Sequence, residues 1–286
     1  MWIAILLLLI FLPVGLLLYM FICACRARPD VQQIELETLP EAFDGTAVLF
    51  ISDIHRRKIS AALVESCMNL GKIDLVLIGG DLKEAGVPLP RSRHNVRMLA
   101  KLAPVYMVYG NHDYDDDIRA LDVMLREEGV RLLINESVIL EKPNGARIRL
   151  SGVDDPHTKR DRLEQALEAD EKEAAFTLLL AHDPVIMTRI DKLQDKVSVD
   201  LVLAGHTHGG QIFLPFIGSV FRSFWNRGWY WPKSAGGFDT AGKIVHKRNK
   251  ARMFVSCGFG TSKLPLRFRA PSEYHLFTLR SAAGKK

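Results

Sequence analysis

Five short segments, far apart in the chain, carry side chains of the kinds that bind divalent metal ions. As candidate ligands they supply two aspartates, one asparagine and four histidines, with His112 and Asp113 beside Asn111, and the segments are Asp53-Ile54-His55, Gly80-Asp81, Gly110-Asn111-His112-Asp113, His182 and Gly205-His206-Thr207-His208. Imidazole and carboxylate groups suit zinc, manganese and iron. A lone Asp53 is more often a turn or cap residue, but the five segments in this order predict a centre with two metal ions.

These segments are positioned by the elements that precede them. Each follows a short apolar run, and amphipathic helical patterns lie between the runs, which is typical of an α/β domain with parallel strands. The predicted strands are 47–51, 75–78, 105–108, 176–181 and 201–204, and the predicted helices are 60–70, 91–102, 116–128 and 184–193. Ligands of open α/β sheets bind at the carboxyl ends of strands, so we expect the five segments to meet at one edge.

Four further strand patterns have no clear helix between several of them. They cover residues 137–140, 146–153, 252–257 and 274–279, and they predict a second, mixed sheet. We therefore expect one domain over residues 47–286, preceded by a linker or edge segment over residues 29–46 and by a distinct N-terminal segment over residues 1–28.

A pair of ions about 3.5–4 Å apart needs a shared ligand, and a carboxylate bridges well. We expect Asp81 to be that ligand. Asp53 and His55 are two residues apart in a segment expected to be extended, so both side chains would point to one side, and His206 and His208 have the same spacing. Two dications with two aspartates keep a surplus charge of about +2, which favours an oxyanion substrate and a bridging hydroxide that attacks phosphorus in line.

Residues beside the ligands are candidates for handling the substrate. Asn111 offers a neutral carbonyl oxygen to an ion, and its neighbour His112 is placed to protonate the leaving oxygen as a general acid. Asp113 is expected to orient the His112 imidazole. Asn111, His112 and Arg56 are the predicted substrate-binding residues, and His112 and Asp113 the predicted catalytic ones.

The five segments resemble the pattern of the calcineurin-like metallophosphoesterase superfamily, which reads D-x-H, G-D, G-N-H-[DE], H and G-H-x-H, and the resemblance covers residues 45–280. It implies a four-layer αββα sandwich with two mixed sheets and a pair of divalent ions, either manganese, iron or zinc. By this resemblance one ion is held by Asp53, His55, Asp81 and His208, and the other by Asp81, Asn111, His182 and His206. His112 would contact the phosphoryl group.

Other segments resemble a narrower branch of that superfamily. They are Gly205–Gln211, Gly152–Pro156 and Gly258–Arg267. Members of this branch often carry an N-terminal membrane segment, and some are described as UDP-2,3-diacylglucosamine pyrophosphatase-like. The chain departs from the usual pattern at Arg56-Arg57-Lys58, where relatives often have glycine, and at Lys83-Glu84. Both departures lie near the expected site entrance and bear on the identity of the substrate.

The N-terminal segment is apolar without interruption by charge. Residues 2–25 contain no charged side chain, and a helix of this length extends roughly 36 Å at 1.5 Å per residue, against about 30 Å for a hydrocarbon core. A signal peptide has a shorter apolar run after a basic start. The pattern therefore predicts an uncleaved single-pass membrane anchor, with a buried core helix as the alternative. Arg26 and Arg28 follow the run and predict a cytoplasmic catalytic domain.

The charge of the remaining chain is mildly basic. The net charge is +5, and without Arg26 and Arg28 residues 29–286 keep 36 basic against 33 acidic side chains. This balance suits an anionic substrate or an anionic membrane surface, and it makes nucleic acid an unlikely partner because no basic stripe is present. Only Cys67 and Cys257 lie beyond the N-terminal segment, so a disulfide framework is excluded.

An aromatic stretch follows the last metal-binding segment. Residues 213–231 hold eight aromatic side chains interleaved with Arg222 and Arg227. Either this is a long loop packed on the sheet edge, or it is a lid that dips into the bilayer interface and presents a lipid-linked phosphate to the metals. The basic stretch 243–252 serves the same surface or forms a solvated hairpin.

The sequence thus predicts a membrane-anchored phosphoester or pyrophosphate hydrolase with a phosphate-containing substrate, such as a nucleotide-linked glycolipid. One alternative is a general phosphodiesterase or phosphatase for soluble nucleotides. Another is a metal-binding scaffold without catalysis. The remaining histidines, His94, His246 and His275, have no partner motif and are expected to be structural, and Asp154, Asp155 and His157 are expected to form a turn.

Overall fold

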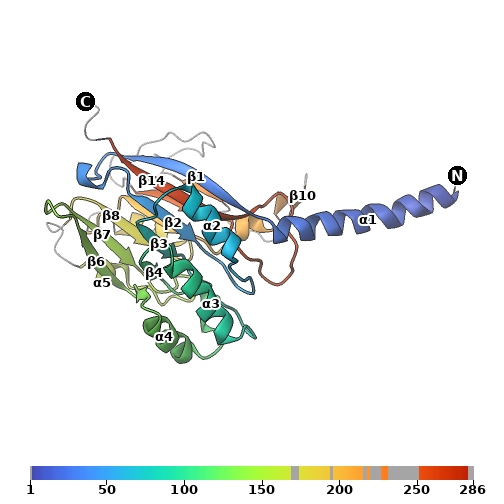
Figure 1. Cartoon of the computed structure of the whole chain (residues 1–286), viewed down its shortest axis with the longest axis horizontal. Coiled ribbons are helices and arrows are strands. Elements are labelled where there is room, and N and C mark those ends of the chain that lie inside the picture. The colour runs from blue at the N-terminus through green and yellow to red at the C-terminus, as the bar shows by residue number, and fades with distance from the viewer. Residues whose placement is uncertain are drawn as a thin grey trace.

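A computed structural model of the chain describes residues 2–168, 174–193, 196–214, 218–219, 227–230 and 251–282. The side chains of residues 4–8, 10, 214, 218 and 219 are outside this description. The described residues form two six-stranded sheets with helices, as the sequence predicts. Figure 1 shows the strands gathered in one body from which helix α1 (Trp2–Cys25) projects.

The first sheet has the strand order β1-β14-β2-β3-β4-β5. Its strands are β1 (Ala27–Leu36), β2 (Ala47–Ile51), β3 (Leu75–Ile78), β4 (Val105–Met107), β5 (Arg131–Leu132) and β14 (Ser272–Ser281). Neighbours from β2 to β5 are parallel, β1 is parallel to β14, and β14 is antiparallel to β2. The sheet is therefore mixed.

The second sheet has the order β12-β13-β9-β8-β7-β6. Its strands are β6 (Glu136–Glu141), β7 (Arg147–Gly152), β8 (Thr177–Leu180), β9 (Leu201–Ala204), β12 (Gly228–Tyr230) and β13 (Arg252–Val255). The inner pairs are parallel, and the edge strands β12 and β6 are antiparallel to their neighbours. A small hairpin, β10 (Phe213–Leu214) with β11 (Gly218–Ser219), lies apart from both sheets.

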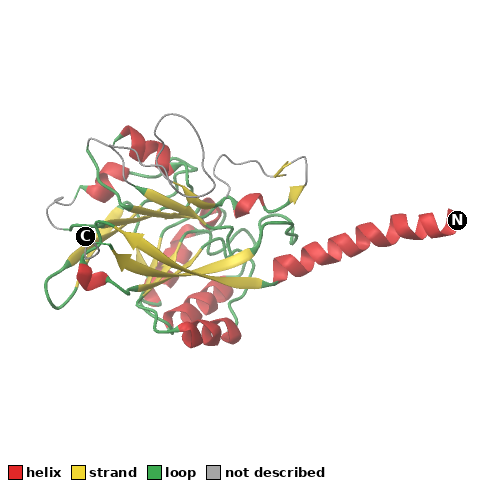
Figure 2. Cartoon of the chain, turned by 90° about the horizontal axis from the view of Figure 1, so that it is seen from above, coloured by secondary structure: helices red, strands yellow, loops and turns green. Residues whose placement is uncertain are grey.

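Helices cover the outer faces, so the domain has four layers. On the first sheet lie α2 (Ala61–Leu70), α3 (Leu89–Ala100) and α4 (Ile118–Glu127), and on the second lie α5 (Leu163–Leu167) and α6 (Ile186–Lys192). In Figure 2 helices are seen on opposite sides of the strands. The αββα arrangement predicted from the resemblance is present.

Strand β2 shows why this sequence forms a double-sided layer. Val48 and Phe50 pack into the cluster between the two sheets, whereas Leu49 and Ile51 pack into the cluster beneath helices α2 to α4. All four side chains are fully buried. A strand covered on both faces is a continuous apolar run, as this one is.

The segment over residues 29–46 is part of the domain rather than a linker. Strand β1 pairs with β14 at ten positions and places Ile34 and Leu36 in the cluster between the sheets. A short 3-10 helix, Glu41–Phe43, then leads into β2. Strand β1 lies at the edge of the first sheet, and the paired structure begins at Ala27 because this edge buries apolar side chains.

Helix α1 (Trp2–Cys25) ends against the domain. The Arg57 guanidinium donates to the Ala24 carbonyl at 3.2 Å, the Arg267 backbone N–H donates to the Met20 carbonyl at 3.0 Å, and the rings of Tyr19 and Phe268 meet edge to face. Within the described part of the chain, no helix was found that has both the length and the apolarity to cross a membrane.

Candidate metal centre

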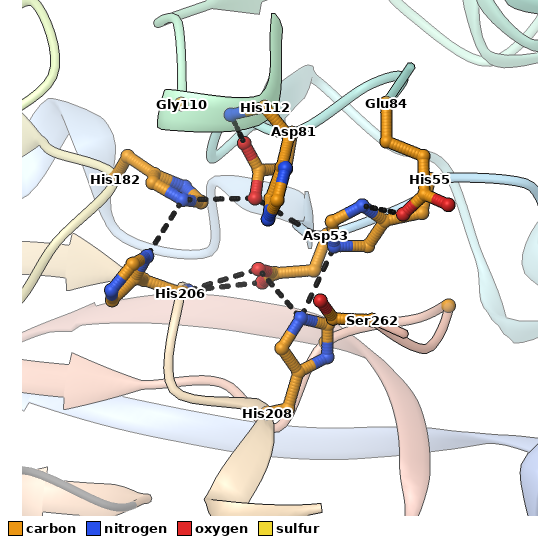
Figure 3. A network of polar contacts seen from close by, with 12 residues as sticks. Asp53, His55, Asp81, Glu84, Gly110, His112, His182, His206, His208 and Ser262 are labelled. Carbon is orange, nitrogen blue, oxygen red and sulfur yellow. Dashed lines mark hydrogen bonds and ion pairs between the residues drawn. The ribbon is translucent and has the colours of Figure 1, made fainter. Parts of the chain in front are cut away.

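The predicted ligands converge at one edge, just beyond the carboxyl ends of β2, β3, β4, β8 and β9. The loops after β2 and β3 are joined by backbone hydrogen bonds from Asp53 N–H to the Gly80 carbonyl, 3.0 Å, and from His55 N–H to the Asp81 carbonyl, 3.1 Å. Figure 3 shows the side chains from these separate loops pointing toward a common centre. The structure thus brings side chains from distant parts of the sequence together at one edge.

One group of ligand atoms comes from Asp53, His55 and His208. The Nε2 atoms of His55 and His208 are 3.1 Å apart, and His208 Nε2 is 3.5 Å from Asp53 Oδ1. Asp53 and His55 have no exposed surface, and His208 is almost fully buried. Such a set of two imidazoles and a carboxylate can hold one divalent ion.

A second group comes from Asp81, His182, His206 and Asn111. His182 Nε2 lies 3.2 Å from Asp81 Oδ2 and 3.2 Å from His206 Nδ1. The Asn111 Oδ1 atom is buried, and no described residue donates a hydrogen bond to it. Buried polar atoms normally have a partner, so this orphaned oxygen fits the role of a metal ligand.

Asp81 lies between the two groups. Its Oδ2 atom is 3.6 Å from His55 Nε2 and 3.2 Å from His182 Nε2, while its Oδ1 atom accepts the His112 backbone N–H at 2.8 Å. One oxygen is thus fixed by the backbone and the other faces both imidazoles. This is the position that a carboxylate shared by two ions requires.

The loops approach so closely that glycine is needed at two positions. A Cβ atom at Gly110 would lie 2.2 Å from Asp81 Oδ1, and one at Gly205 would lie 2.5 Å from Asp53 Oδ2. Neither contact is sterically possible, because the aspartates are themselves held by neighbouring loops. The glycines of the G-N-H and G-H-x-H segments therefore make room for the ligands.

Three ligand imidazoles are oriented by polar groups behind them. His182 Nδ1 lies 2.8 Å from the Gly79 carbonyl, His55 Nδ1 lies 3.0 Å from Glu84 Oε2, and His206 Nε2 lies 3.5 Å from Asp183 Oδ2. Each contact leaves the other ring nitrogen directed at the centre. Partners of this kind fix the tautomer and ring orientation of metal-binding histidines.

Electrostatics favour ionised Asp81. Burial alone would raise its pKa, but the charge and hydrogen bond of His182, with His55 beside it, hold the pKa of this carboxyl well below its usual range. Conversely, burial would lower the pKa of His182, yet the charges of Asp81 and Asp53 raise it well above its usual value. Asp81 and His182 therefore form an ion pair in the metal-free protein. A metal ion can bind between them by displacing the proton of the His182 imidazole.

Asp113 does not contact the ring of His112, contrary to the sequence-based expectation. Its carboxylate accepts backbone N–H groups from Asp81 at 2.9 Å, Gly110 at 2.9 Å and Lys83 at 3.2 Å. The His112 Nδ1 atom lies 2.7 Å from Asp115 Oδ2 instead. Asp113 thus links the loop after β3 to the loop after β4. It can do so because a 3-10 turn over Asn111–Tyr114 points its side chain into the protein.

A cavity of about 330 Å³ opens over the centre. It is lined by Asp81, Asn111, His112, His157, His206, Thr207, His208, Gln211, Ser262 and Lys263. This volume suits a small ligand. The predicted substrate contact Arg56 is not in this lining; its guanidinium pairs with Glu84 and is largely exposed.

Sequence reasoning missed how the G-H-T-H-G-G-Q segment reaches the C-terminal loop. The Gln211 amide donates to the Ser262 carbonyl at 3.0 Å and the Leu264 carbonyl at 2.9 Å, and it accepts the Ser262 N–H at 3.0 Å. Two segments that resemble the narrower branch thereby form one wall of the cavity. The sequence does not indicate this contact, because the two segments are far apart in the chain.

A second polar cluster does not form a reactive site. His275 lies 2.8 Å from Ser256 Oγ through Nε2 and 2.8 Å from Asp30 through Nδ1, the order of a nucleophilic triad. However, Ser256 and His275 have no exposed surface, so a substrate has no access. The cluster ties β1 to β14, and His275 is structural as predicted, as is His94, which contacts the Ile59 carbonyl at 3.0 Å.

Comparison with known proteins agrees with the geometry. Residues 46–210 match the model of the family described as calcineurin-like phosphoesterase. The chain belongs to this family. It is accordingly a hydrolase, and its described residues include groups of side chains that could hold a metal ion. The family membership was predicted from the same five segments.

Several relatives are similar over most of the chain. An uncharacterized protein of Bacillus subtilis, YpbG, is 37% identical over 81% of this chain and 80% of its own length. Phosphodiesterase YaeI of Escherichia coli is 31% identical over 61% of this chain and 64% of its own. A zebrafish transmembrane protein with metallophosphoesterase domain is 31% identical over 89% of this chain and 58% of its own. The chain spans less than two thirds of the last two proteins.

The predicted lid falls largely outside the described residues. Of residues 213–231, Phe213 is partly exposed, whereas Trp229 packs on Phe254 and Phe277 and its indole N–H donates to Gln32 at 2.8 Å. Trp229 therefore belongs to the domain, as the alternative of a packed loop expects. Residues 243–250, with His246, are outside the description.

Proposed function

We propose that the protein hydrolyses phosphoester bonds with two divalent ions at this centre. The single observation that carries the proposal is the position of Asp81, whose Oδ2 atom lies between His55 and His182. One ion would be held by Asp53, His55, Asp81 and His208, and the other by Asp81, Asn111, His182 and His206. The donor set fits manganese, iron or zinc.

When bound, the two ions would supply an acidified water and neutralise the charge that develops on the phosphoryl oxygens. The protein's own part begins with His112, which lines the cavity and whose Nδ1 is held by Asp115. Its other nitrogen can donate a proton to the leaving oxygen. General acid catalysis of this kind contributes about 10²–10⁴ to the rate.

The same residue separates an enzyme from a metal-binding scaffold. A scaffold needs the ligands but gains nothing from a partly exposed imidazole beside them that is oriented by a carboxylate. The name of the Escherichia coli relative, phosphodiesterase, also supports hydrolysis, and it makes phosphodiesters the first substrates to test.

The test uses the full chain, freed of metal with a chelator and then supplied with manganese, iron or zinc. Hydrolysis of bis(4-nitrophenyl) phosphate and 4-nitrophenyl phosphate should require the metal. His112→Ala should lower kcat about 10²–10⁴-fold with unchanged metal content, whereas Asn144→Ala in the exposed turn before β7 should have no effect. Metal-independent turnover, or His112→Ala at the wild-type rate, would contradict the proposal.

We further propose that residues 2–25 hold the protein at a membrane. The segment is an uncharged helix, its described side chains from Phe11 to Leu18 are exposed, and the zebrafish relative is named as a transmembrane protein. The full chain should stay in the membrane pellet after alkaline carbonate extraction, and Leu12→Arg with Leu17→Arg should release it. Extraction of the unaltered chain would exclude this. A nucleotide-linked glycolipid as substrate stays a prediction.

A further inference from the structure

The cavity has a second oriented imidazole that the mechanism above does not use. His157 follows β7 and lines the cavity, and about half of its side chain, 55%, is exposed. Its Nδ1 atom lies 3.2 Å from Asp183 Oδ2, and Asp183 is itself buried. Asp183 thus holds the His157 ring in one orientation at the wall of the cavity.

His157 and His112 occupy corresponding positions at the two ends of the centre. The His112 ring is 5.2 Å from the ring of His55, a ligand of the first group. The His157 ring is 4.7 Å from the ring of His206, a ligand of the second group. In both cases Nδ1 is engaged by a carboxylate, which leaves Nε2 for a molecule in the cavity.

We propose that His157, positioned by Asp183, is a substrate-binding residue that donates a hydrogen bond to a phosphoryl oxygen on the side of the second ion. This inference rests on the proposed phosphoester chemistry. A hydrogen bond from an imidazole N–H to a phosphoryl oxygen is charge-assisted, because the acceptor is anionic. Because Asp183 already orders the ring, little rotamer freedom is lost on binding.

The position assigns His157 a different task from His112. In an in-line displacement the leaving oxygen is opposite the attacking water, and only one group can protonate it. His157 would bind an oxygen that stays on phosphorus. Its loss should therefore weaken binding of the substrate and of the phosphate product alike, whatever the leaving group is.

The first measurement is calorimetric titration of the manganese-loaded full chain with inorganic phosphate. His157→Ala should weaken phosphate binding about tenfold, and His157→Gln, which keeps an N–H donor, should restore part of the affinity. His94→Ala is the matched control because that imidazole lies on helix α3, contacts the Ile59 carbonyl before α2 and does not line the cavity, and it should bind phosphate like the wild type. Unchanged affinity in His157→Ala would overturn the inference.

The second measurement compares 4-nitrophenyl phosphate with phenyl phosphate, whose leaving group is poorer. His157→Ala should raise KM by a similar factor for both esters, whereas His112→Ala should lower kcat more for phenyl phosphate. Bound manganese should stay at the wild-type content in His157→Ala. His157, Asp183 and His206 are close enough to hold an ion themselves, so loss of one ion per chain would overturn a substrate-binding role.

The two proposals can fail separately. Phosphate binding that depends on His157 in a protein that hydrolyses no ester would contradict the proposed function and leave only a phosphate-binding role for His157. Ester hydrolysis with unchanged phosphate binding in His157→Ala would do the reverse.

Discussion

At the scale of single residues, the centre is built from strained backbone. Asp53, His55, Asp81, His206 and His208 all have positive φ, between 50° and 70°. This left-handed region is unfavourable for side chains other than glycine, at of order 1–3 kcal/mol each, and such residues cluster at functional sites. The i, i+2 ligand pairs converge through these tight turns and not through the extended backbone that the spacing predicts.

Glu84 is a positioning residue in this network. Its carboxylate contacts His55 Nδ1 at 3.0 Å and also pairs with Arg56. Glu84→Gln should weaken manganese binding at the first ion about 10–100-fold, since partners behind a ligand histidine typically contribute this much. Glu65→Gln on the exposed face of α2 is the control.

Titration of the metal-free variant with manganese is the measurement for Glu84. Weaker binding of one ion with the other unaffected is expected. Equal affinity at both ions in Glu84→Gln and the wild type would show that the carboxylate does not orient His55.

At the scale of elements, a buried arginine holds the C-terminal loop against the ligand strands. The Arg267 guanidinium has no exposed surface and donates to the carbonyls of Cys257 at 2.6 Å and Pro271 at 2.8 Å. It also lies 3.3 Å from His208 Nδ1. The planar fork reaches several acceptors at once, which a lysine ammonium cannot do.

Arg267→Lys should therefore destabilise the protein by about 2–4 kcal/mol, because several buried carbonyls lose their donor. Urea unfolding of the metal-free chain measures this, with Arg269→Lys at an exposed position as the control. A loss below about 0.5 kcal/mol, which is usual for surface changes, would show that the loop is held by other contacts.

The strands were more predictable than the contacts between loops. The bounds of β2, β3 and β9 agree with the predicted runs at 47–51, 75–78 and 201–204, because buried parallel strands are apolar throughout. The roles of Arg267, Asp115 and Glu84 were not predictable. The partners of these three residues depend on how the loops pack against one another. The spacing of residues in the sequence does not indicate that packing.

At the scale of the whole molecule, helix α1 and the metal centre share one edge of the first sheet. Ala27 at the start of β1 pairs with Ser272, and Phe50 near the end of β2 pairs with His275 of the same strand. The helix thus leaves the domain at the end of the sheet where the ligand loop after β2 begins, and Figure 1 shows it projecting from the body beyond the start of β1. A membrane that holds α1 would lie on the side of the cavity and not behind the domain.

Stability and metal binding should depend on pH in opposite ways. Burial opposes protonation of His55 and His182, but Glu84, Asp81 and Asp53 raise the pKa of His55 above the usual 6.5 in the metal-free chain, and Asp81 and Asp53 do the same for His182. Such groups stabilise the fold fully below pH 6.5, and this stabilisation is lost as the pH rises through the raised pKa. Manganese needs the neutral rings, so its affinity should rise over the same range.

Thermal melts with chelator and with manganese, from pH 6 to pH 9, measure this linkage. The Tm of the metal-free chain should fall as the pH rises, and the increase in Tm given by manganese should grow. A constant manganese effect across the range would mean that no ligand proton is displaced on binding.

The most direct test of the dinuclear centre is the manganese content and electron paramagnetic resonance spectrum of the reconstituted full chain. Two bound manganese ions per chain with a spin-coupled spectrum are expected, because Asp81 Oδ2 faces ligands of both groups. Asp81→Asn should abolish the coupling. One ion per chain, or two ions with uncoupled spectra in the unaltered protein, would contradict a centre bridged by Asp81.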